Sequence, residues 1–581
     1  MAEQVQCRTR RFRLAAAGAA ASLAGAAWLG ACAADSSAGK AVPCDPDNGG
    51  LTLSPGYCAT VFADNLGHVR HLVVAPNGVV YANTWSGGYY PNAPPPEGGF
   101  LVALRDADQD GRAEVIERFG EGLAQGASGG TGVAVYGNAL YAEANDRIVR
   151  YALAAGQVAP SAQPEVIVSG LPLAGDHPMH PFAIDAKGGL FVNLGSASNA
   201  CQVRNRAPGA PGADPCAELA TRGGIWRYDA GRPGQRFSPK ERYATGIRNT
   251  GGIAFDAGGR MFATQHGRDQ LSENWPALYE PGQGADLPAE ELLQVDAGDN
   301  FGWPQCYYDG AQGKLVLAPE YGGDGGKAVG VCAQRKAPAA AFPAHWAPND
   351  VAIYSGAQFP AAWRGGAFIA FHGSWNRAPL PQGGYNVVFQ PLKDGKASGD
   401  WVVFADGFSG AAKDPGKAAF RPAGLAVGPD GALYIADDVK GRIWRVAHTG
   451  AVGTGAIAPA PAPKPAAVAA APGAALPVPP GATAEQVALG EKIYHGASGG
   501  TCAGCHGVDG AGTPLGPALT GGTWLWGDGG LASITDIVAK GVPTPKEYRA
   551  PMPPAGGAQL SPQEVAAVSA YVWAIGHAER R

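Results

Sequence analysis

The chain has 581 residues, among them 88 glycines and 49 prolines, and only 16% of its residues are charged. Glycine and proline at this density interrupt helices, so the composition excludes a mostly helical protein and favours short strands joined by turns. The formal net charge of −5 gives no support to a nucleic-acid partner, which needs a basic surface. Hydrophobic residues reach 46%, so the chain is not disordered either.

The N-terminus predicts export. Four arginines precede an apolar, alanine-rich run over residues 14–28, which is the layout of a bacterial signal peptide. Leu29-Gly30-Ala31-Cys32 follows this run and resembles a lipoprotein signal. We therefore expect a signal peptide over residues 1–31, a lipid on Cys32 and a tether over residues 32–40. An ordinary signal peptide that is cut nearby is the alternative.

The same segment carries two weaker signals about the destination. Arg10-Arg11 suggests twin-arginine export, although the surrounding motif is imperfect. Ala33, rather than an aspartate, follows the expected lipid site and favours the outer membrane by resemblance to lipoprotein sorting. The expected location is the periplasm, with the lipid as the only membrane anchor.

The cysteine pattern agrees with export. Of ten cysteines, one leaves with the signal, one takes the lipid and two belong to a motif described below. The remaining six form an even set, which predicts disulfides in an oxidising compartment. Six cysteines allow fifteen connectivities. Our hypothesis joins near neighbours: Cys44 with Cys58, Cys201 with Cys216, and Cys306 with Cys332.

A loose repeat runs through the larger part of the chain. Each copy has two or three apolar residues, a turn with glycine, and an apolar strand with an aromatic residue, which predicts a β-hairpin. The copies lie at residues 73–81, 133–141, 182–191, 253–262, 351–368 and 425–434. A spacing of about 71 residues exceeds that of common propeller families, so we expect a mainly β fold over residues 41–448, a six-bladed β-propeller with long inserted loops. A two-sheet sandwich is the alternative.

A linker and a small helical domain follow. Residues 449–480 are rich in alanine and proline and predict a semi-extended spacer. Within residues 481–581, Thr483-Ala484-Glu485-Gln486 is a capping box that opens one helix. Ser561-Pro562-Gln563-Glu564 opens another helix, with proline at its first position. We therefore expect an all-α domain at this end of the chain.

The strongest signal in the chain lies in this helical domain. Cys502-Ala503-Gly504-Cys505-His506 is the C-x-x-C-H motif for covalent haem attachment. Cys502 and Cys505 are expected to bind the haem vinyl groups, and His506 to bind the iron. The segment resembles a class I cytochrome c domain, including Gly516-Pro517-Ala518-Leu519 after the motif.

The second axial ligand follows by elimination. Of the four methionines, only Met552 lies in this domain, within the stiff Pro551-Met552-Pro553-Pro554. A His/Met pair raises the reduction potential of a haem, which suits an electron acceptor. A bis-histidine or open site that uses His495 or His577 is the alternative.

Chemistry in the large domain is the expected source of electrons for the haem. The large domain has no G-x-G-x-x-G after a strand at its start and no P-loop. A nicotinamide transfers hydride and is an awkward donor to a one-electron haem. A bound quinone or flavin fits better, because it takes two electrons and releases them singly.

The large domain resembles the pyrroloquinoline quinone (PQQ)-dependent glucose/sorbosone dehydrogenases over about residues 57–447. The segments that carry this resemblance are Asp176-His177 with residues 182–195, Gly246-Ile247-Arg248-Asn249, Gln265-His266-Gly267-Arg268, Asn300-Phe301-Gly302-Trp303-Pro304, His372-Gly373-Ser374-Trp375-Asn376-Arg377 and Arg421-Pro422. After Gly195 the chain departs from the best-known soluble glucose dehydrogenases, so substrate contacts there are not carried over. The chain agrees better with the sorbosone-type branch.

The resemblance implies a set of site residues. His177 is the expected general base, with Asp176 beside it to orient the substrate or the base, and His180 is the competing base. The residues expected to contact PQQ are Arg248, Asn249, Arg377 and Arg421, and a calcium ion is expected on the backbone carbonyls of Gly267 and Arg268. For Arg248, a structural ion pair is the alternative role.

These residue types suit that chemistry. PQQ carries carboxylates, which guanidinium groups bind in a fork. A neutral histidine can take the proton of a hydroxyl group whose carbon loses hydride. Calcium, a hard cation bound by oxygens, polarises the quinone carbonyl that receives the hydride.

A second calcium site is predicted in an acidic loop. Asp106, Asp108, Asp110 and the following Gly111, with Glu117 further on, fit the pattern D-x-D-x-D-G-x5-E. The flanking segments predict strands rather than helices, so the loop is not part of an EF-hand. We expect a structural calcium in a blade turn, and a solvated acidic turn is the alternative.

Together these features predict a quinohaemoprotein. The expected reaction is oxidation of a sugar, or of a related alcohol or aldehyde, with hydride passing to PQQ. Single electrons then pass to haem c and to an external acceptor, a cytochrome or a quinone-linked chain. A ligand-binding or sensing propeller with a separate electron-transfer cytochrome is one alternative, and a calcium-dependent propeller lactonase is another.

Overall fold

The computed structural model describes residues 44–578, except 86, 88, 91–93, 124–128, 451–455, 462–475, 496–501, 508–509, 511, 513–515, 522–523, 549–550 and 559. The expected signal peptide, the tether with its lipid site Cys32 and most of the linker lie outside the described residues. Within the described residues, no helix combines the length and apolar character needed to cross a membrane.

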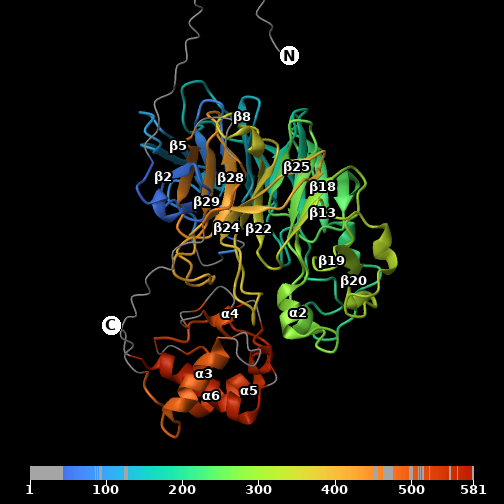
Figure 1. The fold of residues 1–581 in the computed structure, drawn as a ribbon, viewed down its shortest axis with the longest axis vertical. Helices are drawn as coiled ribbons and strands as arrows, with labels where there is room; N and C mark the ends of the chain where they lie inside the picture. The colour runs from blue at the N-terminus through green and yellow to red at the C-terminus, as the bar shows by residue number, and fades with distance from the viewer. Residues whose placement is uncertain are drawn as a thin grey trace, which may run out of the picture. The chain divides into compact units, whose positions relative to one another are not determined.

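Six large sheets make up the first domain (Figure 1). From the innermost strand outward, they are β3 (His71–Val74), β4 (Val80–Asn83), β5 (Leu101–Arg105) and β6 (Val115–Phe119); β7 (Val133–Tyr136), β8 (Ala139–Ala144), β9 (Arg147–Ala152), β10 (Glu165–Ser169) and β14 (Gln235–Arg236); β11 (Phe182–Ile184), β12 (Gly189–Leu194), β13 (Gly224–Asp229) and β15 (Arg242–Thr245); β16 (Ile253–Phe255), β17 (Met261–Gln265), β18 (Glu290–Val295) and β21 (Ala340–Phe342); β22 (Pro348–Ile353), β23 (Ala367–Phe371), β24 (Asn386–Gln390), β27 (Val402–Asp406) and β1 (Thr52–Leu53); and β28 (Pro422–Val427), β29 (Leu433–Asp437), β30 (Ile443–His448) and β2 (Tyr57–Ala63). The innermost strands adjoin in a closed ring, β3-β7-β11-β16-β22-β28 and back to β3. The predicted six-bladed β-propeller is therefore confirmed, and the sandwich is excluded.

The ring is closed by strands from both ends of the domain. β2 pairs antiparallel with β30, with Thr60 opposite Arg445. Figure 1 shows β2, in blue, beside the orange β28 and β29. Because β2, near the start of the domain, and β30, at its end, share one blade, their pairing holds the ring closed.

The innermost strands approach one another very closely. A side chain at Gly251, just before β16, would place its Cβ 2.6 Å from the carbonyl oxygen of Pro348 in β22. A side chain at Gly424 in β28 would lie 2.6 Å from the carbonyl oxygen of Arg70, just before β3. Only glycine permits these contacts, and they bring the segments that precede the inner strands together.

The blades pack face to face through aromatic side chains. Tyr57 of β2 contacts Phe404 of β27 in the neighbouring blade, with ring centroids 4.9 Å apart, and Phe191 of β12 contacts Phe255 of β16 at 5.5 Å. Every residue of β12 and of β23 is buried. Both faces of these strands lie between neighbouring layers, and this explains their nearly continuous apolar sequences.

Shorter elements lie in the segments that connect the strands of the blades. They are the hairpins β19 (Cys306–Asp309) with β20 (Lys314–Leu317) and β25 (Leu392–Lys393) with β26 (Lys396–Ala397); the helices α1 (Leu271–Asn274) and α2 (Pro281–Asp286); and the 3-10 turns Asn48–Gly50, Glu121–Leu123, Ala217–Ala220, Pro239–Glu241, Pro319–Tyr321, Gly330–Gln334 and Ala361–Trp363. The three predicted disulfides are confirmed: Cys44–Cys58, Cys201–Cys216 and Cys306–Cys332.

The second domain is helical. Its helices are α3 (Ala484–Tyr494), α4 (Cys502–His506), α5 (Leu531–Lys540) and α6 (Pro562–Gly576), with a 3-10 turn at Pro554–Gly557. The predicted capping box at Thr483 is present, and Ser561 forms a second one: they exchange hydrogen bonds with Gln486 and Glu564. α3 crosses α6 closely, because a Cβ at Gly490 would lie 2.0 Å from the carbonyl oxygen of Ala567.

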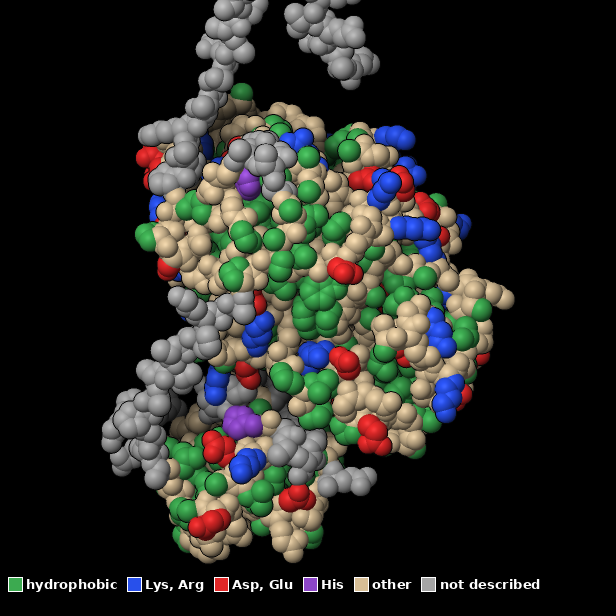
Figure 2. All heavy atoms as spheres, viewed as in Figure 1, with side chains coloured by type: hydrophobic (Ala, Val, Ile, Leu, Met, Phe, Trp, Pro, Cys, Tyr) green, Lys and Arg blue, Asp and Glu red, His purple; other side chains and the backbone are tan. Residues whose placement is uncertain are grey.

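Charge is mixed over the surface. On the face shown in Figure 2, acidic and basic side chains are interspersed and apolar side chains lie between them. This distribution agrees with the small net charge of the chain.

Candidate functional site

His177 lies in the segment before β11 and is 8% exposed. Its Nδ1 is 2.9 Å from the carbonyl oxygen of Ser196 and 3.1 Å from that residue's hydroxyl oxygen. A carbonyl oxygen only accepts, so Nδ1 carries the proton and Nε2 keeps its lone pair. Burial, and then the positive charge of Arg248, hold the pKa of His177 well below 6.5. The imidazole is therefore neutral at physiological pH and is a proton acceptor at Nε2.

The competing histidine is engaged at both ring nitrogens. Nδ1 of His180 lies 3.1 Å from Oε1 of Glu143, and Nε2 donates to the carbonyl oxygen of Pro172 at 2.9 Å. Glu143 is fully buried and also accepts the backbone N–H groups of Thr131 and Gly132. His180 therefore belongs to a structural network, and His177 is the histidine with a nitrogen to offer.

Asp176 does not orient His177, contrary to one of its two expected roles. Its Oδ2 lies 3.0 Å from Nη2 of Arg206, and Asn205 donates to its Oδ1 at 3.3 Å. The orienting partner of the base is Ser196, which the sequence analysis missed. The only signal for Ser196 was its place directly after Gly195, two residues beyond the end of β12.

Arg248 is 3% exposed and is held by neutral and charged groups. It donates to the carbonyl and side-chain oxygens of Asn199 at 3.1 and 3.0 Å, and to the carbonyl oxygen of Gly267 at 3.0 Å. Its Nη2 lies 2.9 Å from Oδ2 of Asp269. Burial would raise the pKa of Asp269, but Arg248 and Arg206 hold it below its usual range. The structural ion pair considered for Arg248 is thus present, with Asp269 as the partner.

Asn249 is paired with a second neutral histidine. Its Nδ2 lies 3.1 Å from Nδ1 of His266, and Nε2 of His266 lies 3.1 Å from the carbonyl oxygen of Pro348. Burial, then Arg248 and Arg70, lower the pKa of His266 to about 3. Arg248 and Arg70 come from different blades, and both lower the pKa of this ring. The two guanidiniums and the His266 ring therefore share one electrostatic environment.

A second cluster, around Asp438, was missed by the sequence analysis apart from Arg421. Asp438 accepts from Nη1 of Arg70 at 2.8 Å and from the Tyr90 hydroxyl at 2.9 Å, and its Oδ1 lies 2.6 Å from Nε2 of His372. Arg421 donates to the carbonyl oxygen of His372 at 3.1 Å. Burial, then Arg421, lower the pKa of His372 to about 4.

The position of Arg70 in the repeat was a usable signal. Arg70 directly precedes the innermost strand β3, as Arg421 directly precedes β28. The arginines Arg70, Arg248 and Arg421 come from three blades and depress the pKa of neighbouring histidines. Asp269 and Asp438 pair with Arg248 and Arg70, and guanidinium groups are the side chains that bind carboxylates in a fork, so the cluster suits an anion with several carboxylates.

Arg377 is not brought to this cluster. Its guanidinium donates to the carbonyl oxygen of Ala344 at 3.0 Å and lies 3.2 Å from Oδ1 of Asp286 at the end of α2. The neighbouring Asn376 instead reaches Oδ1 of Asp269 at 3.0 Å. The expected contact of Arg377 with PQQ is therefore corrected, because backbone carbonyls and a surface carboxylate hold the side chain elsewhere.

The calcium position expected from the sequence lies at Gly267 and Arg268, where the carbonyl oxygen of Gly267 accepts a hydrogen bond from Arg248 at 3.0 Å. A small cavity is lined there by Arg248, Gly267, Arg268 and Glu291, among others. Oε2 of Glu291 is buried without a hydrogen-bond partner in the described part of the chain. Burial raises the pKa of Glu291 to about 8. A carboxylate is a ligand that calcium prefers, but the guanidiniums of Arg248 and Arg268 line the same cavity, and calcium binding here stays a prediction.

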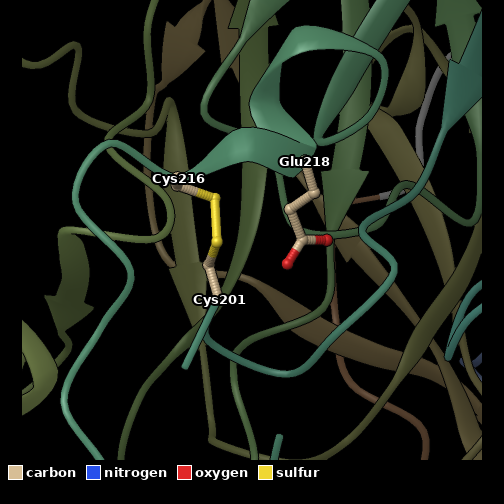
Figure 3. A group of neighbouring side chains, drawn as sticks. All are labelled: Cys201, Cys216 and Glu218. Carbon is tan, nitrogen blue, oxygen red and sulfur yellow. A yellow bond between two sulfur atoms is a disulfide. The ribbon is translucent and has the colours of Figure 1, made fainter. Parts of the chain in front are cut away.

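One disulfide-bonded loop supplies several of these contacts. Figure 3 shows the Cys201–Cys216 disulfide beside the Glu218 side chain. Glu218 accepts the backbone N–H groups of Ala197 at 2.6 Å and Ser198 at 3.2 Å. These contacts fix the turn directly after Ser196, the partner of the base.

The carboxylates of the predicted acidic loop lie close together, but Glu114 takes the place that was expected for Glu117. Carboxylate oxygens of Asp106, Asp108, Asp110 and Glu114 lie within 4.8 Å of one another. Glu117, the expected twelfth-position ligand, instead lies in β6 and accepts the backbone N–H of Ala159 at 3.2 Å. The strand between the two glutamates turns Glu117 away from the loop. Calcium binding here stays a prediction.

The helical domain holds a cavity lined mostly by apolar side chains. Cys502, Cys505, His506 and Met552 all line it, as expected for a covalent haem. Nδ1 of His506 donates to the carbonyl oxygen of Pro517 at 2.9 Å, so Nε2 is the nitrogen left for the iron.

The alternative axial ligands are placed elsewhere. Neither His495 nor His577 lines the cavity. His577 stacks on Trp573 with ring centroids 4.1 Å apart. The cavity is also lined by Trp524, Trp526, Lys546 and Tyr548, which the sequence analysis did not single out.

Comparison with known proteins supports both domains. The TrAA12-like family matches residues 51–449, and the cytochrome c family matches residues 487–576. A pyrroloquinoline quinone-dependent pyranose dehydrogenase of Coprinopsis cinerea is 27% identical over 238 residues, which are 34% of this chain and 30% of that protein. An uncharacterised protein of Borreliella burgdorferi is 27% identical over 219 residues, 36% of this chain and 48% of that protein. The chain thus spans less than half the length of these relatives.

Solved structures share the propeller fold. A Trichoderma reesei carbohydrate-active enzyme of family AA12 aligns with a TM-score of 0.54 at 18% identity, over 69% of this chain and 98% of that chain. The PQQ domain of pyranose dehydrogenase from Coprinopsis cinerea aligns with a TM-score of 0.52 at 18% identity, over 68% of this chain and 97% of that chain.

Proposed function

Because the chain belongs to the TrAA12-like family and a cytochrome c domain follows the propeller in the sequence, we propose that it is a PQQ- and calcium-dependent sugar dehydrogenase. It oxidises a sugar, or a related alcohol or aldehyde, and passes electrons to its own haem c. One observation carries the proposal. A buried neutral histidine with its proton fixed on Nδ1 lies among arginines that suit a polycarboxylate.

Different residues of the chain have different roles in the proposed reaction. Nε2 of His177 takes the hydroxyl proton while Ser196 holds the other ring nitrogen. Arg248, Arg70 and Arg421 would hold the cofactor carboxylates, and the carbonyl oxygens of Gly267 and Arg268, with buried carboxyl groups nearby, would hold calcium. When bound, PQQ supplies an electrophilic quinone carbon that accepts the hydride.

The helical domain then carries single electrons. Cys502 and Cys505 would hold the haem covalently, and His506 and Met552, which line the same cavity, would bind its iron. The external acceptor is a cytochrome or a quinone-linked chain. The protein works in the periplasm, anchored by a lipid on Cys32 to the outer membrane. The three disulfides support an oxidising compartment.

The test is haem reduction in a reconstituted protein. The full chain with haem attached is supplied with PQQ, calcium and an aldose, and the absorption band of reduced haem is followed. Reduction that requires both PQQ and sugar is the expected result. If no member of a broad sugar panel reduces the haem, the dehydrogenase is excluded. A protein that binds no PQQ on titration would be a binding propeller, and one that hydrolyses lactones with calcium alone would be a lactonase.

A further inference from the structure

The protein itself occupies most of the hydrogen-bond donors of Arg248. A guanidinium group carries five N–H groups. Nε of Arg248 donates to the carbonyl oxygen of Asn199 at 3.1 Å, and Nη2 donates to the side-chain oxygen of Asn199 at 3.0 Å. Nη2 also donates to Asp269 at 2.9 Å, and Nη1 donates to the carbonyl oxygen of Gly267 at 3.0 Å. Within the described residues, one N–H group on Nη1 is therefore left for a ligand.

Asn199 supplies two of these four contacts and has a single possible orientation. Its side chain is completely buried. The carbonyl oxygen of Asp269 lies 2.9 Å from the Asn199 amide, and a carbonyl oxygen only accepts, so the atom that faces it is Nδ2. Oδ1 then faces the opposite way, toward Arg248, and also accepts the backbone N–H of Asp269 at 2.9 Å. Reversal of the amide would break three hydrogen bonds, so Asn199 holds one edge of the guanidinium in place.

The backbone of Asn199 is fixed as firmly as its side chain. Its N–H donates to the side-chain oxygen of Asn205 at 3.0 Å. Its carbonyl oxygen, which binds Nε of Arg248, also accepts Nε1–H of Trp303 at 3.1 Å. Every polar group of this residue therefore has a partner, and a fully satisfied buried network of this kind is rigid.

One short segment holds both the candidate base and this arginine. Ser196 binds Nδ1 of His177, and Asn199, three residues further along, binds Arg248. Arg248 is also the charged group that lowers the pKa of His177 most. The relative position of the two side chains is therefore set by residues 196–199.

The segment 196–199 is itself clamped from one side. Glu218 accepts the backbone N–H groups of Ala197 and Ser198, and the disulfide Cys201–Cys216 follows directly. The chain departs from the best-known soluble glucose dehydrogenases in this segment, and Asn199 is absent from the expected set of site residues.

We propose that Asn199 is a positioning residue that occupies two donors of Arg248 and fixes the guanidinium so that one N–H group remains to bind PQQ. Arg248 then gives the cofactor a single hydrogen bond of fixed direction rather than a fork. This inference rests on the proposed function, because it takes PQQ as the ligand of Arg248.

The test is a double-mutant cycle on PQQ affinity, measured by titration of the full chain, with haem attached, in the presence of calcium. Asn199→Ala should weaken PQQ binding about tenfold, because the guanidinium loses a charge-assisted hydrogen bond that orients it. In the Arg248→Gln background, the same replacement should change the affinity by less than about twofold, because the side chain that it positions is gone. A purely structural role for Asn199 predicts the same factor in both backgrounds, and this result would overturn the proposal.

The matched control is Asn77→Ala, which removes an exposed asparagine from the turn between β3 and β4 and should leave PQQ affinity unchanged. Thermal unfolding of each variant checks that it is folded.

A second measurement needs neither PQQ nor the Arg248 variant. The groups that act on the pKa of His177 are Arg248, the backbone of Ser196, His266 and Arg206. Since Arg248 lowers this pKa, release of its guanidinium in Asn199→Ala should raise the pKa of His177 by about half a pH unit in an NMR titration. An unchanged pKa would show that Arg248 keeps its place without Asn199, and would overturn the proposal even if Arg248→Gln does not fold.

Failure of this inference and failure of the proposed function are distinguishable. A wild-type protein that binds no PQQ overturns both. A wild-type protein that binds PQQ but oxidises no sugar overturns the dehydrogenase alone, because the affinity cycle uses no sugar. An active protein in which the cycle shows equal factors overturns only the role of Asn199.

Discussion

Replacing His177 by alanine removes the proposed proton acceptor from the candidate site. Ser196 binds Nδ1, so the group lost from the reaction is the Nε2 lone pair. Positioned general bases contribute about 10²–10⁴-fold to a rate, which corresponds to roughly 3–5 kcal/mol. We expect His177→Ala to slow haem reduction by that factor in a single-turnover stopped-flow experiment. PQQ affinity should be unchanged on titration, because the neutral imidazole contributes no charge to the arginine cluster.

The pH dependence of the haem reduction rate provides a second test of the role of His177. Burial and Arg248 hold the pKa of His177 well below 6.5, and protonation removes the base. The rate should therefore stay level as the pH falls from 8 to 6.5 and decline only at lower pH. Ser196→Ala is the matched control, since it keeps the carbonyl that binds Nδ1, and it should cost no more than about tenfold. A His177→Ala protein at the wild-type rate, or a decline centred near pH 6.5, would refute the reasoning.

Three further results are expected. Replacing both Cys201 and Cys216 by alanine should lower the free energy of unfolding by about 3 kcal/mol in urea titrations, because the bond closes a 15-residue loop, and an unchanged midpoint would contradict this. Met552→Ala should lower the haem reduction potential in spectroelectrochemistry, since loss of the thioether removes the ligand that raises it, and an unchanged potential would exclude Met552 as the ligand. Glu143→Ala should cost about 3–5 kcal/mol by the same urea assay, because it leaves the buried His180 without its charged partner, and a loss below 1 kcal/mol would show that the pair is dispensable.

Features carried by adjacent residues were predictable from the sequence. The haem motif is five residues long, and a short helix, α4, presents both cysteines and His506 to one cavity. The capping boxes and the three disulfides are similarly local, since each disulfide joins cysteines at most 26 residues apart. The six repeats followed from turn glycines and apolar strands, because hairpins are formed by neighbouring segments.

Contacts between blades were not predictable in the same way. Arg70 and Asp438 are 368 residues apart in the chain, and closure of the ring brings them within 2.8 Å. Asp176 seemed a natural partner for His177 because it is adjacent in sequence, but its side chain turns to Arg206 on a distant loop. Sequence proximity was misleading here, because the charge of Asp176 is compensated by an arginine 30 residues further along the chain.

The acidic loop shows the same limit at short range. The three aspartates were correctly grouped, yet Glu114 takes the place expected for Glu117. The choice depends on where β6 begins, because that strand pairs with β5 and directs Glu117 outward.

The sequence by itself determined the blades, the five-residue haem motif and the disulfides, because each depends on residues within one hairpin, turn or loop. Only the tertiary structure decided which arginines share the site, which group orients His177 and which carboxylates are paired. Those contacts exist because six inner strands, separated by tens to hundreds of residues, meet around one axis.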